Sequence, residues 1–121
     1  ENCKPSQIGT IARKFPGVPF IMDMGFRAPV RPPEIEFGNE MRDLVKACPN
    51  LYLGLTALTT CQPAYLMSTI WTGGPERVVL GSFAPSGIPL FAVKGLKWAG
   101  LDRRDEALIF GENLKKIYRL A

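Results

Sequence analysis

Histidine is absent from the 121-residue sequence, and this absence limits the chemistry that the chain can perform alone. Histidine is the most common general base and a frequent zinc ligand, and it activates many serine and cysteine nucleophiles. Carboxylates, hydroxyls and thiols therefore remain as candidates. The three cysteines, Cys3, Cys48 and Cys61, form no Cys-x-x-Cys pair. We therefore expect reduced, buried thiols in a cytoplasmic protein.

Polar residues that could act on a substrate follow two short apolar runs. Asp23 ends the run at 18–23 and is a candidate ligand or base; capping of the proline-rich segment after it is the alternative. Ser82 ends the run at 77–82, but without histidine it is expected to form a turn rather than to attack a substrate. Phe83 either lines an apolar pocket or fills space beside these residues.

Two arginines, Arg27 and Arg31, lie in the segment after Asp23. Arginine binds carboxylates through two parallel hydrogen bonds, so these residues could hold a carboxylate substrate; simple solvent exposure is the alternative. Met24, Arg27 and Phe83 are the candidate substrate-binding residues.

The candidates must be positioned by an alternation of short apolar runs and amphipathic segments. Strands are predicted at 18–23, 51–56 and 77–82. Residues 26–36, with three prolines, are expected to be an extended loop. The predicted helices, in which Trp71 and Trp98 are expected to face the core, are 6–14, 38–48, 63–71, 89–99, 103–110 and 112–120, with Gly111 separating the last two. This order predicts an α/β fold with parallel strands, whose carboxyl ends would carry any site.

Length and composition predict one globular domain, 1–121, with 46% hydrophobic residues. The net charge of +4 is spread over several helices, as expected for solvated faces rather than a nucleic-acid-binding surface. No apolar run approaches the roughly 18 residues of a membrane span. We therefore expect neither nucleic acid nor membrane as a partner.

Four segments in order, 15–22, 48–53, 75–82 and 111–117, are similar to runs in amidohydrolase-related proteins. The first three resemble the runs into that family's sixth, seventh and eighth strands, and the last resembles its closing helix. The chain thus resembles the C-terminal half of a family whose members are metal-dependent (β/α)8 barrels. The resemblance implies a partial TIM barrel with about three strands and five to six helices.

The chain departs from the family at the residues that hold the metal. The family has a histidine before its Met/Leu-Gly pair, whereas Asp23 directly precedes Met24. The family has an aspartate, its metal ligand and general base, after Gly-Ser, whereas this chain has Phe83. A catalytic zinc needs about three protein ligands. The metal ligands are therefore missing, no metal is expected to bind to this chain alone, and the chain alone is expected to be inactive.

The resemblance implies a hydrolase or decarboxylase dependent on zinc or another divalent metal. Its substrates would be small cyclic or aromatic carboxylates, amides or lactones. A non-catalytic binding or interaction module on the same scaffold is the alternative. Because three strands cannot close a barrel of eight, we expect a homo-oligomer or a complex with an N-terminal half. Rearrangement into a small three-layer sandwich is a further possibility.

Overall fold

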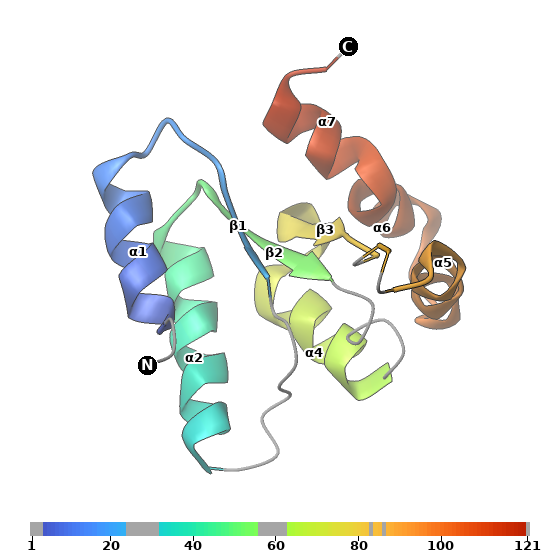
Figure 1. Ribbon diagram of the computed structural model, residues 1–121, viewed down its shortest axis with the longest axis horizontal. Coiled ribbons are helices and arrows are strands. Elements are labelled where there is room, and N and C mark those ends of the chain that lie inside the picture. Colours follow the sequence, from blue (N-terminus) through green and yellow to red (C-terminus); the bar gives the residue numbers. More distant parts are fainter. Residues whose placement is uncertain (1–3, 24–31, 56–62, 83, 86, 121) are drawn as a thin grey trace.

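Three parallel strands, arranged in chain order, form the centre of the computed structural model (Figure 1). They are β1 (Phe20–Asp23), β2 (Leu51–Leu55) and β3 (Val78–Leu80). The structure describes residues 4–23, 32–55, 63–82, 84–85 and 87–120. The predicted parallel α/β arrangement is confirmed.

Helices connect the strands and continue after the last one. Those before β3 are α1 (Pro5–Lys14), α2 (Pro32–Ala47), α4 (Pro63–Gly73) and the short 3-10 helix η1 (Pro75–Arg77). Those after it are α5 (Pro89–Trp98), α6 (Arg103–Ala107), the π-helical turn η2 (Leu108–Glu112) and α7 (Asn113–Tyr118). Helix α2 packs between α1 and α4, whereas η2 and α7 lie beside β3 (Figure 1). Within the described part of the chain, no helix combines the length and apolar character that crossing a bilayer requires.

The core lies between one face of the sheet and the helices. Side chains alternate between the two faces of a strand, and Leu51, Leu53 and Leu55 all point into this core, where none is exposed. Residue Val78 of β3 lies beside Leu53 in the sheet and is equally buried. The helices complete the core with Ala12, Met41, Leu44, Val45, Cys48, Leu66, Ile70, Leu96 and Ile109.

The opposite face of the sheet is covered unevenly. In β2 and β3, Tyr52 and Val79 are 7% and 4% exposed. In β1, Ile21 is 41% exposed although it lies beside Tyr52, and Asp23 is exposed beside Gly54. The sheet is therefore open to solvent on this face at its β1 end.

The structure corrects the extended loop predicted at 26–36, because α2 begins at Pro32. The first turn of a helix needs no backbone N–H donors, so it accepts proline with its fixed φ. Prolines at 32 and 33 thus begin a helix that starts six residues before the predicted residue 38. Residues 26–31 lie outside the described part.

The predicted burial of two tryptophans is wrong, since Trp71 is 76% exposed and Trp98 is 82% exposed. Helix α4 faces the core with Leu66 and Ile70, and a residue next to Ile70 is turned by about 100°. Helix α5 faces the core with Ala92 and Leu96. Trp98 lies two positions beyond Leu96, about 200° around the helix, and points outward.

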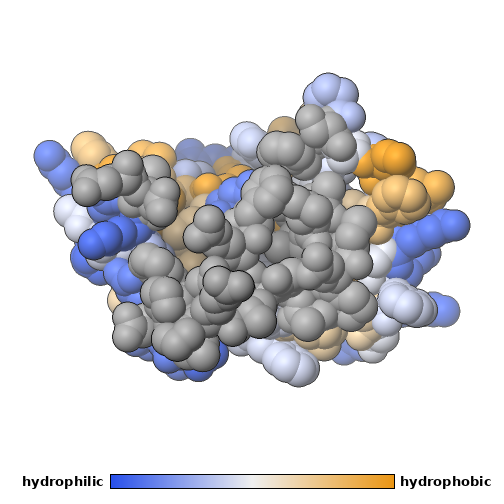
Figure 2. All heavy atoms as spheres, turned by 60° about the horizontal axis from the view of Figure 1, so that its bottom comes forward, coloured by the Kyte–Doolittle hydropathy of each residue, from blue (hydrophilic) through white to orange (hydrophobic). Residues whose placement is uncertain are grey.

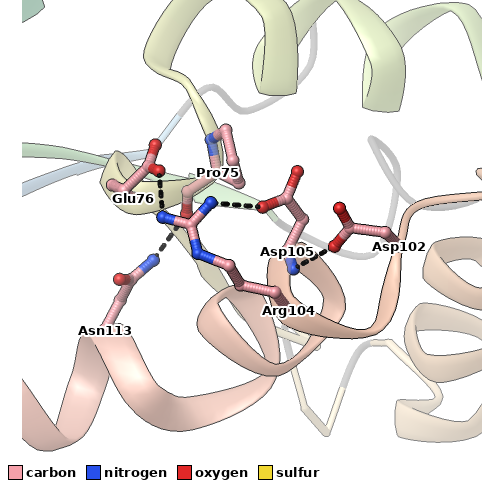
Figure 3. A network of polar contacts seen from close by, with 6 residues as sticks. All are labelled: Pro75, Glu76, Asp102, Arg104, Asp105 and Asn113. Carbon is pink, nitrogen blue, oxygen red and sulfur yellow. Dashed lines mark hydrogen bonds and ion pairs between the residues drawn. The ribbon is translucent and has the colours of Figure 1, made fainter.

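Gly111 does not separate two helices as predicted. Helix α6 continues through η2 into α7, and the N–H of Asn113 donates to the carbonyl of Leu108, five residues earlier. Gly111 is the fourth residue of this wide turn, and a Cβ atom at this position would have no other atom within 4 Å. Asp102 caps α6, since its side chain accepts from the backbone N–H of Asp105 at 2.8 Å (Figure 3).

Candidate functional site

The carboxyl ends of the three parallel strands lie along one edge of the sheet, where chemistry occurs in barrels of this kind. Directly after β3 the backbone still lies against β2, because the N–H of Gly81 donates to the carbonyl of Leu55 at 2.6 Å. A Cβ atom at position 81 would lie 2.9 Å from the same oxygen. Position 81 therefore requires glycine, and this contact fixes where Ser82 begins the segment after the strand.

Asp23 and Ser82 lie on opposite sides of this edge. Asp23 ends β1 and is exposed, whereas Ser82 follows β3 and is half-buried. Strand β2 separates them, and two strand spacings amount to about 10 Å. The structure does not bring these two predicted residues together, so neither can activate the other directly.

The predicted substrate-binding residues Met24, Arg27 and Phe83 lie outside the described residues, as does Arg31. Their roles stay predictions. Cys48 is buried and unpaired at the end of α2, as expected.

The described residues of this edge do not fit a zinc ion. Zinc sites use three or four sulfur, nitrogen or oxygen ligands within about 2.0–2.3 Å of the metal. The sequence has no histidine, and the described parts of the chain contain no group of three or more cysteine, aspartate or glutamate side chains close enough to share a metal. Asp23 is one exposed carboxylate, which cannot form such a site.

Comparison with known proteins gives no match to any protein-family model. Likewise, no curated protein matches the sequence.

Solved structures do match. An amidohydrolase from Burkholderia multivorans with bound zinc superposes with a TM-score of 0.78 at 16% identity, over 97% of this chain and 49% of the other. The same enzyme with bound HEPES gives a TM-score of 0.78 at 15% identity. The chain thus has the fold of about half of this amidohydrolase structure. A third structure, the 5-carboxyvanillate decarboxylase LigW from Sphingomonas paucimobilis, gives a TM-score of 0.54 at 19% identity, over 95% of this chain and 28% of the other.

The chain spans about half the length of the Burkholderia amidohydrolase. The predicted partial TIM barrel is therefore confirmed as a fold, with three parallel strands in the expected order. At these identities the likeness concerns the fold alone, and what the matched proteins bind or act on is said of those proteins.

Sequence reasoning missed the side chains that hold the other edge of the sheet in place. Arg77 lies over the ring of Tyr52, with 5.5 Å between Cζ and the ring centre, and it donates to the carbonyls of Pro49 and Leu51. The Asn50 amide nitrogen lies within 3.0 Å of carbonyl oxygens of Ala12, Phe15 and Val18. The position of Asn50 directly after Pro49, at the entry to a strand, was the available signal.

Proposed function

We propose that the chain acts as the C-terminal half of an amidohydrolase-type barrel, within a metal-dependent hydrolase or decarboxylase. The observation that carries this proposal is the superposition of almost the whole chain on about half of an amidohydrolase crystallised with zinc. Its likeness to a carboxyvanillate decarboxylase supports the inclusion of decarboxylation. The proposed substrates are small cyclic or aromatic carboxylates, amides or lactones.

On this proposal, zinc or another divalent metal is held by residues outside this chain. Asp23 is the one carboxylate that the described residues place at this edge of the sheet. No catalytic step is therefore assigned to this chain by itself. The chain contributes the strand ends, with the Gly81–Leu55 contact setting the position of the segment after β3. Arg27, Met24 and Phe83 are proposed to contact the substrate.

Metal analysis tests this division of roles. The purified chain is incubated with zinc, dialysed and analysed by inductively coupled plasma mass spectrometry. We expect far less than one zinc per chain, and no difference between the unaltered chain and Asp23→Asn, because one exposed carboxylate binds zinc weakly. One zinc per chain that is lost in Asp23→Asn would contradict the assignment of the ligands to another polypeptide segment.

A non-catalytic binding module is the second candidate, favoured by the poor fit of the described edge to a metal. It predicts that benzoate raises the melting temperature of the metal-free chain and that Arg27→Gln abolishes the effect. The enzyme proposal predicts instead that Arg27→Gln leaves any stabilisation by benzoate unchanged.

The proposed partner is a second copy or an N-terminal half that covers the open end of the sheet. Four apolar residues on the β1 side, Ile11, Phe15, Val18 and Ile21, are each between 41% and 49% exposed. Burial of such side chains contributes about 25 cal/mol per Å² of apolar surface, which favours association. We also propose a cytoplasmic location, consistent with the unpaired thiol of Cys48.

A further inference from the structure

A hollow lies at the amino-terminal edge of the sheet, opposite the edge expected to carry catalysis. Its volume is about 190 Å³. Three parts of the chain border this shallow, open hollow: the turn between α1 and β1, the start of β2, and the end of α7. The lining residues used below are Pro16, Gly17, Tyr52, Lys116, Ile117 and Arg119.

The hollow carries positive charge without a neighbouring negative charge. Lys116 and Arg119 both line it, and no acidic residue does. Neither side chain forms an ion pair with any carboxylate of the described residues, whereas Lys115 next to them pairs with Glu112 at 2.7 Å. Basic residues are favourable near the C-terminal end of any helix, because their positive charge offsets the negative end of the helix dipole. That explanation accounts for their presence on α7 but not for their position beside Tyr52.

Tyr52 supplies a second, independent observation. Its side chain is 93% buried, since its exposed fraction is 7%. No described residue forms a hydrogen bond with its hydroxyl, although a buried tyrosine usually has such a partner. Among the described side chains, the one buried oxygen without a hydrogen-bond partner is Oδ1 of Asp105. Because Tyr52 lines the hollow, a ligand bound there would meet its side chain.

The walls of the hollow are held in place before any ligand arrives. Asn50 fixes the turn at 15–18 through the carbonyls of Phe15 and Val18. Arg77 covers the ring of Tyr52 and is itself held by the carbonyl of Leu51 at 3.2 Å. A hollow whose walls are already in place loses less entropy on binding than one that must form around the ligand, although the charged ends of Lys116 and Arg119 are themselves exposed.

We propose that this hollow binds a small oxyanion, a phosphate or carboxylate group. Lys116 and Arg119 would donate charge-assisted hydrogen bonds to it, and the Tyr52 hydroxyl a further one. The apolar surfaces of Pro16 and Ile117 would contact a small organic body attached to the anion. The site is distinct from the carboxyl edge and needs no metal, so its test does not depend on the proposed function.

The experiment titrates the uniformly ¹⁵N-labelled chain with inorganic phosphate, and separately with benzoate, at constant ionic strength set with chloride. We expect saturable shifts of the amide signals of Gly17, Ile117 and Arg119. Stronger binding of phosphate assigns the site to phosphate groups, and stronger binding of benzoate to carboxylates with an apolar body.

Variants identify the residues that bind. Lys116→Gln/Arg119→Gln is expected to weaken binding by at least about tenfold, because two charge-assisted donors are lost. Tyr52→Phe keeps the buried ring and is expected to weaken binding several-fold. The matched control Lys94→Gln/Lys97→Gln removes the same net charge from exposed positions on α5 and should leave binding unchanged.

Three results would overturn the proposal: shifts that do not saturate, unchanged binding in Lys116→Gln/Arg119→Gln, or equal weakening in the α5 control. The last would show that only net charge attracts the anion.

Discussion

Two asparagines perform the same task at the entrances to two strands. Asn50 precedes β2 and holds the turn before β1, whereas Asn113 begins α7 and holds the turn before β3. The amide nitrogen of Asn113 donates to the carbonyl of Pro75 at 2.7 Å (Figure 3) and to the carbonyl of Val78 at 2.8 Å. The residue is 2% exposed, so these carbonyls have little access to water as an alternative donor.

Replacement of Asn113 by alanine is expected to destabilise the chain. It leaves the carbonyls of Pro75 and Val78 without this donor, at a cost of about 1–3 kcal/mol for each buried group. Because the Pro75 contact is only part-buried, we expect a total loss in the lower part of that summed range, about 2–4 kcal/mol. Urea denaturation followed by circular dichroism measures the change. Glu112→Ala, at the neighbouring exposed position, is the control and should change the free energy of unfolding by less than about 0.5 kcal/mol. Equal effects of both would refute this role of Asn113.

Gly81 is expected to tolerate no side chain. In Gly81→Ala the new Cβ would meet the carbonyl oxygen of Leu55 at 2.9 Å, and a backbone atom cannot move aside cheaply. We expect a loss of about 1–3 kcal/mol in the free energy of unfolding. Gly17→Ala is the matched control, because a Cβ atom at position 17 would have no other atom within 4 Å. A Gly81→Ala chain as stable as Gly17→Ala would show that the edge is not tightly packed there.

At the scale of elements, strand and helix types followed from the pattern of apolar residues, but several boundaries and faces did not. The strand predicted at 51–56 is β2, with leucines buried at alternate positions. The helix predicted at 38–48 overlaps α2, where Met41, Leu44, Val45 and Cys48 are buried. The predicted burial of Trp71 and Trp98 was wrong, because both are apolar yet point away from the core. Apolarity alone does not say which of two stripes on a helix faces inward when both carry large side chains.

The candidate site was less predictable than the fold. The parallel order placed Asp23 and Ser82 at one edge, as expected, but their separation by β2 depends on the sheet order. The hollow at the opposite edge combines Tyr52 from β2 with Lys116 and Arg119 from the end of the chain, which lie more than sixty positions apart in the sequence. Long-range proximity of this kind depends on how α7 packs, and local residue patterns do not encode it.

Two helical glycines should respond oppositely to alanine. Nothing lies within 4 Å of a Cβ at Gly111, so Gly111→Ala is expected to stabilise by about 0.5–1 kcal/mol through higher helix propensity. A Cβ at Gly9 in α1 would overlap Cδ2 of buried Leu44 in α2. Gly9→Ala is therefore expected to destabilise by about 1–2 kcal/mol as the two helices separate. Thermal and urea denaturation of both variants check the signs; stabilisation by Gly9→Ala would mean that Leu44 adapts without cost.

For the whole molecule, the open end of the sheet and the exposed apolar residues of α5 make association the expected behaviour. Ile88, Leu90, Phe91 and Trp98 are each at least 51% exposed. Apolar side chains also gather at the end of the molecule where α5 and α6 lie (Figure 2). Contiguous exposed apolar surface of this kind marks interaction sites in soluble proteins.

Size-exclusion chromatography with light scattering is expected to show a mass that rises with concentration towards a dimer. Ile21→Ser should shift this equilibrium towards the monomer, because Ile21 lies on the open face of β1. Trp98→Ser tests α5 as the alternative contact. A monomer at every accessible concentration would contradict self-association and leave an N-terminal half as the proposed partner.

The wide turn at Leu108–Glu112 limits which insertions and deletions this part of the chain can accept during evolution. A further residue inserted there as ordinary α-helix would rotate every later position by about 100°. The amide of Asn113 would then swing away from Pro75 and Val78, and Lys116 and Arg119 would leave the hollow together. Point substitutions should be tolerated in this stretch far better than a change of its length.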